Sequence, residues 1–259
     1  MIYKMKGRPI MNKIACIIPA RLNSFRFPKK ALADILGKPL IQHVYERASL
    51  SPLVRDNVYV ATCDQEIINV VKSFGGKALK TSPDHPRPTS RVFEAAKMLN
   101  ADLVVDVQGD EPLVNPQMID SAIGAYKKSD GAVGVSLMER CGYEDALDKN
   151  KVKVVFDRDF NALFFSREPI PSKWLGDKKF PFYFVVAVFV YPLQSLELFN
   201  RLKMTQLENI ESVDLLRFVE NGYKIKMVET PYLSCSIDVF DDIKTAEGLM
   251  RKEALFINQ

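Results

Sequence analysis

Short apolar segments that are typical of buried strands alternate with segments of helical periodicity along the first half of the chain. Largely apolar runs at residues 14–18, 58–61 and 103–107 predict strands that are buried on both faces. Apolar residues recur at helical spacing between these runs, and residues 78–80 predict one more short strand. Because helices separate the strands, the pattern predicts an α/β fold with a mostly parallel sheet and right-handed crossovers.

Polar residues next to the predicted helices indicate where those helices begin. Asp64 and Thr89 are expected to cap the helices that follow them. Asn115 followed by Pro116 predicts a third helix start, since proline suits the first helical position.

The second half of the chain contains strand-like segments joined by shorter and less regular connections. We interpret this part, at about residues 132–200, as a mixed-sheet extension that forms a lobe or a dimer surface. Its strands are expected at residues 132–137, 152–156, 162–165 and 183–191. Helical spacing returns afterwards and predicts two helices, at residues 211–220 and 242–255. A short strand is expected between them at residues 225–228.

Composition excludes several classes of function. The 36 Lys and Arg residues nearly balance the 32 Asp and Glu residues, and a net charge of +4 is too small for nucleic-acid binding by overall attraction. The most apolar run, residues 182–191, is too short to span a membrane. The four cysteines have no CxxC spacing and are expected to be reduced. We therefore expect a cytosolic enzyme or binding protein without a nucleic-acid or membrane partner.

No internal repeat, low-complexity block or long linker divides the chain. We predict one domain over residues 13–259 and interpret residues 1–12 as an N-terminal extension with little role in the fold.

A strongly basic turn follows the first predicted strand directly. It contains Arg21, Arg26, Lys29 and Lys30, interleaved with small polar residues and proline. Two interpretations stay open on charge spacing alone, namely a site that binds a polyanion and a solvated basic loop.

Two carboxylates also fall where strands are expected to end. Asp110 follows the strand of residues 103–107 within the sequence QGDEP, and Asp238 lies near the end of another strand-like stretch. In an open parallel sheet, ligands bind at the carboxyl ends of the strands. Carboxylates that face Lys and Arg there indicate Mg²⁺ and phosphate, and hence phosphoryl or nucleotidyl transfer. The plainer alternatives are a turn aspartate at Asp110 and a helix cap at Asp238.

Other chemistries have little support in the sequence. There is no GxxxxGK[ST] and no GxGxxG motif, which disfavours a P-loop ATPase and a dinucleotide-binding Rossmann enzyme. His43 and His85 have no Ser or Cys partner visible in the sequence, so nucleophilic catalysis and a zinc site are not expected.

Several motifs in one order resemble the CMP-Kdo synthetases, or 3-deoxy-manno-octulosonate cytidylyltransferases, of the sugar nucleotidyltransferase superfamily. The similarity runs over nearly the whole chain from Lys13 on. IIPARLNSFRFPKKAL is similar to that family's PAR-x-x-S-x-R-x-P-x-K loop, and VQGDEP, SREPIP and IDVFDD follow in the family's order. The resemblance implies a Rossmann-like nucleotidyltransferase fold, with a mostly parallel central sheet flanked by helices and a smaller mixed-sheet extension.

The resemblance also implies a reaction and its participants. An acceptor hydroxyl attacks the α-phosphorus of CTP in the presence of Mg²⁺, which forms a CMP-linked product and releases pyrophosphate. The partners are CTP and a small acidic acceptor, and family members are usually cytoplasmic homodimers. The lobe at about residues 132–200 is then the part expected to bind the acceptor.

Carried over position by position, the resemblance assigns roles to individual residues. The catalytic residues are Arg21, Lys30 and Asp110, and the Mg²⁺ ligands are Asp110 and Asp238. The nucleotide-binding residues are Pro19, Ala20, Arg21, Ser24, Arg26, Lys30, Arg87, Thr89 and Gln108. The acceptor-binding residues are Gln108, Arg167, Tyr183 and Asp214.

Three departures from the family pattern bear on specificity. Residues 84–91 read DHPRPTSR, with Arg87 and Pro88 in place of a small Ser-Gly pair, so Arg87 is either an extra anion contact or a solvated loop residue. Residues 185–189 lack the family's histidine, and residues 214–217 carry an apolar side chain in place of an amide.

The acceptor is therefore the least determined part of the prediction. We expect a cytidylyltransferase for Kdo or a related 2-keto sugar acid. The alternatives are another small acceptor such as a phosphonate, another nucleoside triphosphate, and a catalytically silent nucleotide-binding relative.

Overall fold

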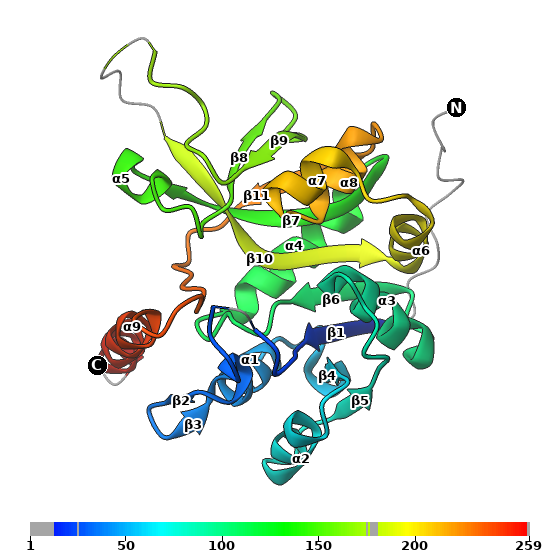
Figure 1. Cartoon of the computed structure of the whole chain (residues 1–259), viewed down its shortest axis with the longest axis vertical. Helices are drawn as coiled ribbons and strands as arrows, with labels where there is room; N and C mark the ends of the chain where they lie inside the picture. The colour runs from blue at the N-terminus through cyan, green and yellow to red at the C-terminus, as the bar shows by residue number, and fades with distance from the viewer. Residues whose placement is uncertain (1–12, 25, 175, 177–180, 258–259) are drawn as a thin grey trace.

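A nine-stranded sheet runs through the middle of the computed structural model, which describes residues 13–24, 26–174, 176 and 181–257 (Figure 1). The predicted N-terminal extension, residues 1–12, lies outside the described residues. The strands follow one another across the sheet in the order β11-β7-β10-β6-β1-β4-β5, and β8 and β9 branch from β10.

The parallel part of the sheet comes from the first half of the chain, as predicted. Neighbouring strands pair in parallel across β6 (Leu103–Val107), β1 (Ile14–Pro19), β4 (Val58–Thr62) and β5 (Ala78–Lys80). Successive side chains of β1 alternate between two hydrophobic clusters, with Cys16 and Ile18 in one and Ala15 and Ile17 in the other. The continuous apolar run of β1 therefore reflects burial on both faces.

The second half of the chain adds a mixed extension to the same sheet. β10 (Phe182–Pro192) lies antiparallel between β6 and β7 (Ala132–Cys141), and β11 (Lys224–Glu229) pairs with β7 in parallel. β8 (Lys153–Phe156) and β9 (Ala162–Ser166) form an antiparallel pair that joins β10 through β8. The mixed extension is confirmed, and it is continuous with the central sheet because β10 pairs with both parts.

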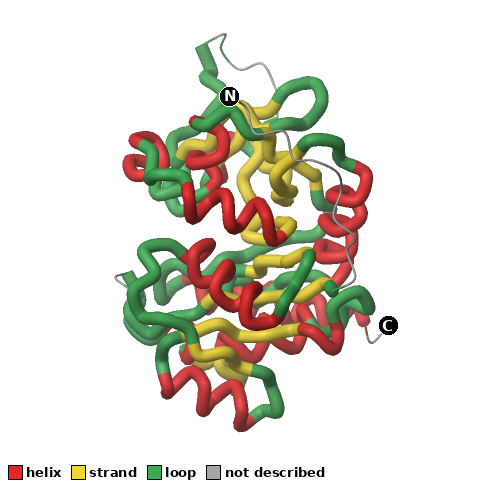
Figure 2. The backbone as a smooth tube through the Cα atoms, turned by 90° about the vertical axis from the view of Figure 1, so that its right-hand side faces the viewer, coloured by secondary structure: helices red, strands yellow, loops and turns green. Residues whose placement is uncertain are grey.

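Helices cover both faces of the sheet (Figure 2). One face carries α1 (Leu40–Ala48), α2 (Gln65–Ser73), α4 (Pro116–Lys128) and α9 (Asp242–Ile257). The other face carries α3 (Pro88–Leu99), α6 (Leu193–Arg201) and α8 (Leu215–Glu220). The remaining short elements are 3₁₀ turns, a two-stranded sheet and two helices: η1 (Lys30–Leu32), η2 (Arg55–Asn57), β2 (Asp34–Ile35), β3 (Lys38–Pro39), α5 (Tyr143–Ala146) and α7 (Gln206–Glu211).

The predicted helix starts have different outcomes. Asn115 caps α4 as predicted, because its Oδ1 accepts a hydrogen bond of 2.9 Å from the backbone N of Gln117. The Thr89 cap is wrong, since α3 already begins at Pro88 and Arg87 holds the N-cap position. Asp64 precedes α2 but does not cap it with its side chain.

Two further predictions of secondary structure are wrong. The helix expected at residues 211–220 is divided, because Ser212 adopts a left-handed conformation with φ of 53° and ends α7 before α8 starts. The stretch before Asp238 has no regular secondary structure and lies outside the sheet. It is held instead by a bond of 2.9 Å from the backbone N of Ile237 to the carbonyl oxygen of Asp110.

Two predictions from composition agree with the structure. All four cysteines, Cys16, Cys63, Cys141 and Cys235, are free thiols. Among the described residues, none of the helices combines the length and the apolar character that crossing a membrane requires.

Candidate active site

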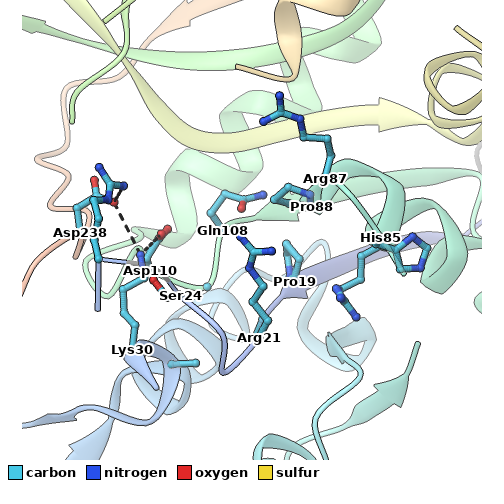
Figure 3. Close-up of a pocket in the computed structure, with 15 residues that line it drawn as sticks. Pro19, Arg21, Ser24, Lys30, His85, Arg87, Pro88, Gln108, Asp110 and Asp238 are labelled. Carbon is cyan, nitrogen blue, oxygen red and sulfur yellow. Dashed lines mark hydrogen bonds and ion pairs between the residues drawn. The ribbon is translucent and has the colours of Figure 1, made fainter. Parts of the chain in front are cut away.

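Two adjoining cavities open where β1 and β6 end, with volumes of about 240 Å³ and 760 Å³. The smaller one lies against the basic turn that follows β1, and Figure 3 shows the residues around it. Both cavities are lined by Arg21, Arg87, Gln108, Asp110 and Asp238. The predicted site residues from the two halves of the chain therefore meet at one edge of the sheet.

The basic turn supplies three cations to the smaller cavity. Arg21, Arg26 and Lys30 all line it, together with Ser24 and the chain at Pro19 and Ala20. Lys29 points elsewhere and pairs with Glu66 at 2.9 Å. The backbone N of Leu22 donates a hydrogen bond of 2.8 Å to Oδ2 of Asp64, which fixes the start of the turn. This bond explains why Asp64 does not cap α2.

Lys30 brings the two predicted metal ligands together. Its Nζ lies 2.6 Å from Oδ2 of Asp110 and 3.9 Å from Oδ1 of Asp238. Arg26 reaches the same carboxylate, with Nη2 2.5 Å from Oδ1 of Asp238. Burial raises the pKa of Asp238, and the nearby Asp110 charge raises it further. Two acidic side chains beside one ammonium group favour a cation there. The helix-cap alternative for Asp238 is wrong, because α9 begins only at Asp242 and the Asp238 carboxylate pairs with Arg26 instead.

A glycine and a buried acid hold the chain that carries these aspartates. A Cβ on Gly109 would lie 2.8 Å from the carbonyl oxygen of Pro19, so the end of β6 can approach β1 only without a side chain there. Glu111 is 2% exposed and accepts a hydrogen bond from the Ser236 hydroxyl. Burial and the Asp110 charge raise the pKa of Glu111 to about 8.

Of the two environments that the sequence left open for Arg87, the structure excludes the solvated one, and the extra anion contact stays a prediction. Its guanidinium turns away from the basic turn, as Figure 3 shows, and it is only 14% exposed. Its Nη1 donates to the Ser212 hydroxyl at 3.0 Å, and its Nε lies 3.4 Å from Oε1 of Glu208 and 3.5 Å from Oδ1 of Asp214. The solvated alternative is therefore wrong, and the charge of Arg87 is already paired.

Thr89 and Asp214, predicted for the nucleotide and the acceptor respectively, contact each other. The Thr89 hydroxyl donates a hydrogen bond of 2.6 Å to Oδ2 of Asp214. Both residues line the larger cavity. Together with Arg87, this bond fastens the start of α3 to the start of α8.

Two of the other predicted acceptor residues line the larger cavity and one does not. Arg167 and Gln108 line the larger cavity. Tyr183 is not among the described residues that line this cavity. Its ring packs against the ring of Phe156, with centroids 5.2 Å apart. The structure thus brings three of the four predicted acceptor residues, Gln108, Arg167 and Asp214, to the cavity.

Asp106 fixes the Gln108 side chain through a hydrogen bond. Gln108 donates a hydrogen bond of 2.7 Å from Nε2 to Oδ1 of Asp106, which is 1% exposed. Oδ2 of Asp106 has no hydrogen-bond partner among the described residues. Burial, and then the nearby Asp214 charge, raise the pKa of Asp106 well above its usual value.

Sequence reasoning missed three residues at this site. His85 and Arg91 line the smaller cavity, and Asp106 supports Gln108. His85 contacts Glu94, and Arg91 is buried and donates to Thr81. The DHPRPTSR motif contains His85 and Arg91 and could have indicated them, whereas Asp106 lies in a strand that reads simply as buried.

Comparisons with known proteins show which family the chain belongs to. A family model described as cytidylyltransferase matches residues 15–225. The chain is 43% identical over 245 residues to a 3-deoxy-manno-octulosonate cytidylyltransferase of Thermodesulfovibrio yellowstonii, which covers 90% of this chain and 96% of the relative. It is 40% identical over 243 residues to an 8-amino-3,8-dideoxy-manno-octulosonate cytidylyltransferase of Shewanella sediminis, which covers 91% of this chain and 97% of the relative.

Solved structures support the same assignment. A structure of CMP:2-keto-3-deoxy-manno-octonic acid synthetase complexed with CTP superposes with a TM-score of 0.86 at 33% identity, covering 93% of this chain and 100% of that one. A 4-diphosphocytidyl-2C-methyl-D-erythritol synthase of Anaerococcus prevotii, at 18% identity and a TM-score of 0.61, covers 92% and 98% and shares the fold alone. The predicted Rossmann-like nucleotidyltransferase fold is confirmed. The chain belongs to the cytidylyltransferase family and, within it, to the 3-deoxy-manno-octulosonate cytidylyltransferases.

Proposed function

We propose that this nucleotidyltransferase transfers CMP from CTP to a hydroxyl of 3-deoxy-manno-octulosonate or a related 2-keto sugar acid. The observation that carries the proposal is the meeting of Arg21, Arg26 and Lys30 with Asp110 and Asp238 at one cavity. This arrangement suits a triphosphate, whose negative charges need several cations and a divalent metal. The relative that was solved with CTP supports the choice of nucleotide.

In this reaction the acceptor oxygen forms a bond to the α-phosphorus, and the bond from that phosphorus to the oxygen of pyrophosphate breaks. One proton leaves the attacking hydroxyl. Arg21, Arg26 and Lys30 would bind the phosphate oxygens and offset the negative charge that moves to pyrophosphate. The chain's contribution is therefore orientation and charge, without a covalent protein intermediate.

The carboxylates fit a divalent cation of the Mg²⁺ type. Mg²⁺ binds one or two protein carboxylates and takes its other ligands from water and phosphate. Asp110 and Asp238 provide that number of oxygen ligands, and no group of three or more metal-binding side chains exists among the described residues. Bound Mg²⁺ would neutralise phosphate charge at the reacting centre. Lys30 keeps the two carboxylates together at the cavity.

The larger cavity is the proposed acceptor site. Arg167 offers a guanidinium for the acceptor carboxylate, and Gln108 offers its amide for a hydroxyl. The wall of the same cavity includes Val185, Ala187 and Phe189, which cannot hydrogen-bond a sugar through their side chains. This wall limits how many acceptor hydroxyls the site can recognise, and a related 2-keto sugar acid is as compatible with it as Kdo.

We also propose that the protein acts as a cytoplasmic homodimer. The extension at residues 132–200 carries exposed apolar side chains, with Leu163 57% and Trp174 89% exposed. Large exposed apolar side chains in one region are typical of contact surfaces. Light scattering during size-exclusion chromatography tests the dimer, and a monomeric mass would contradict it.

The test of function measures pyrophosphate release by the purified protein. CTP, UTP, ATP and GTP are each supplied with Kdo, with its 8-amino-8-deoxy analogue and with a phosphonate acceptor, with and without Mg²⁺. We expect turnover with CTP and an octulosonate in the presence of Mg²⁺, and its loss on chelation with recovery on adding Mg²⁺ back. Absence of turnover with every acceptor, together with absence of CTP binding, would overturn the proposal.

A further inference from the structure

Lys153 in β8 is a fully buried cation whose partners are main-chain carbonyls. Its Nζ donates to the carbonyl oxygens of Asp148 at 2.7 Å, Lys151 at 2.7 Å and Arg167 at 2.6 Å. The residue has 0% exposure. No described Asp or Glu forms an ion pair with it, and all three donors of the ammonium are used. A buried charge is costly unless it is hydrogen-bonded, and here three main-chain carbonyls satisfy the ammonium.

These three bonds join two segments that the hairpin alone does not fix. Asp148 and Lys151 belong to the loop that leads into β8, whereas Arg167 follows the end of β9. In the hairpin register Lys153 lies opposite Ser166, one residue before Arg167. Lys153 therefore holds the main chain of Arg167 and the loop of residues 148–151 at the same point.

The same loop holds the Arg167 side chain. Nη1 of Arg167 donates to the carbonyl oxygens of Lys149 at 2.9 Å and Asn150 at 3.2 Å, and Nε donates to the carbonyl oxygen of Glu211 at 2.7 Å. Nη2 has no acceptor among the described residues, and Arg167 lines the larger cavity. The guanidinium is thus fixed on two nitrogens, and its third nitrogen is left for a ligand.

Arg167 also lies near the charges of the phosphate side. Burial lowers the pKa of Arg167, Arg26 lowers it further, and Asp238 raises it. Asn150 of the loop accepts a hydrogen bond from Nη1 of Arg26. The loop of residues 148–151 therefore contacts both Arg167, proposed for the acceptor, and Arg26, proposed for the triphosphate.

We propose that Lys153 is a positioning residue for acceptor binding, because it fixes the main chain of Arg167 and the loop whose carbonyls orient the Arg167 guanidinium. The ligand it serves is the carboxylate of the acceptor, which pairs with Nη2 of Arg167. This inference rests on the proposed function. A merely structural lysine would affect stability, whereas a positioning lysine affects acceptor binding in particular.

The test compares Lys153→Met with Lys226→Met in the full chain. Lys226 lies in β11, and its Nζ donates to the main-chain carbonyl of Asp159 outside both cavities, so its substitution controls for losing a lysine that bonds the main chain. For Lys153→Met we expect the KM for the octulosonate to rise at least about tenfold. The KM for CTP should rise by less than about threefold, because among the described residues the loop reaches the phosphate side only through the bond between Arg26 and Asn150. For Lys226→Met we expect both KM values to stay near wild type. Equal changes in both KM values of Lys153→Met, or no change in either, would overturn the inference.

A double-mutant cycle tests whether Lys153 acts through Arg167. Adding Lys153→Met to an Arg167→Met background should raise the acceptor KM by less than about twofold, because the positioned group is already gone. A full additional tenfold rise would show that Lys153 acts elsewhere. If Lys153→Met does not fold, Lys153→Arg takes its place, since it keeps the charge but cannot reproduce three bonds from one nitrogen. A lowered unfolding midpoint with an unchanged acceptor KM in that variant would contradict the positioning role.

Wild-type protein in the same assay separates the two proposals. Absence of wild-type turnover refutes the proposed function and, with it, this inference. Wild-type turnover with an unaltered acceptor KM in a folded Lys153 variant refutes only the role of Lys153.

Discussion

Lys30 and Asp110 form an ion pair, with Nζ and Oδ2 2.6 Å apart, that joins the basic turn to the end of β6. Lys30 donates a second bond of 2.6 Å to the carbonyl oxygen of Ile237, next to Asp238. One lysine therefore holds three separate parts of the chain at the cavity. The carboxylates it gathers carry negative charge at the place where we propose that triphosphate and metal bind.

Asp110→Asn should abolish most turnover and leave the fold intact. The amide keeps the size of the side chain and an oxygen that accepts from Lys30, but it removes the negative charge that a divalent cation needs. We expect kcat/KM to fall at least about 100-fold, or about 2.7 kcal/mol of transition-state stabilisation. Pyrophosphate release measures the loss, and an unchanged urea midpoint is the check on folding. A variant with full activity would mean that Asp110 is not a metal ligand.

Asp64→Ala should weaken CTP binding through the basic turn. The substitution removes the acceptor for the backbone N of Leu22 and leaves that donor without its partner. A lost hydrogen bond of this kind is worth about 1 kcal/mol, so we expect the KM for CTP to rise about fivefold. Asp64→Asn is the matched control, since its Oδ1 can still accept from Leu22 and its KM should stay near wild type. Equal KM values in the two variants would contradict this role.

The contrast between Asp64 and Asn115 shows how far the sequence could predict local structure. Both residues precede a helix and both are favourable caps. Asn115 caps α4 through a residue two positions away, whereas Asp64 bonds Leu22, which lies 42 positions earlier in the chain. Local pattern predicts the first kind of contact, because the partner is in view. The second depends on how distant segments come together.

Separation along the chain also distinguishes the features of the site that the sequence predicts from those that it does not. Strands such as β1 and β6 were predictable, because a continuous apolar run has few other environments. Arg87 was not, since its partners Ser212, Glu208 and Asp214 are more than 100 positions away. The sequence contains each charge but does not show which charges neutralise each other. The predicted motifs therefore located the cavity more reliably than they described the contacts of single side chains.

Arg87→Gln should lower stability without weakening CTP binding. The guanidinium pairs with Glu208 and Asp214 rather than with the residues of the basic turn. Because Glu208 keeps Arg217 as a partner at 2.6 Å, the loss should be moderate, at about 1 to 2 kcal/mol of unfolding free energy. Urea unfolding and the KM for CTP are the two measurements. Arg21→Gln is the comparison and should show the reverse, with a higher KM and an unchanged midpoint.

Asp106→Asn should make the protein more stable at neutral pH than wild type. The native pKa of Asp106 is raised well above its unfolded value by burial, so the native state keeps a proton that the unfolded state loses. Below the unfolded pKa both states are protonated and the penalty is absent. As pH rises above it, wild-type stability falls by up to about 1.4 kcal/mol per pH unit until the native pKa is reached. Asparagine does not ionise and still accepts from Gln108.

The difference in unfolding free energy between Asp106→Asn and wild type should therefore grow from about pH 4 toward pH 7. Urea unfolding at several pH values measures it. The titratable neighbours of Asp106 include Asp110, Asp214, Cys16 and Tyr191, and burial raises the pKa of the last three. They are present in both proteins, so their own titration largely cancels in the difference. A difference that stays constant with pH would show that Asp106 ionises in the native state as readily as in the unfolded chain, and a lower kcat in the variant would show that its charge takes part in turnover.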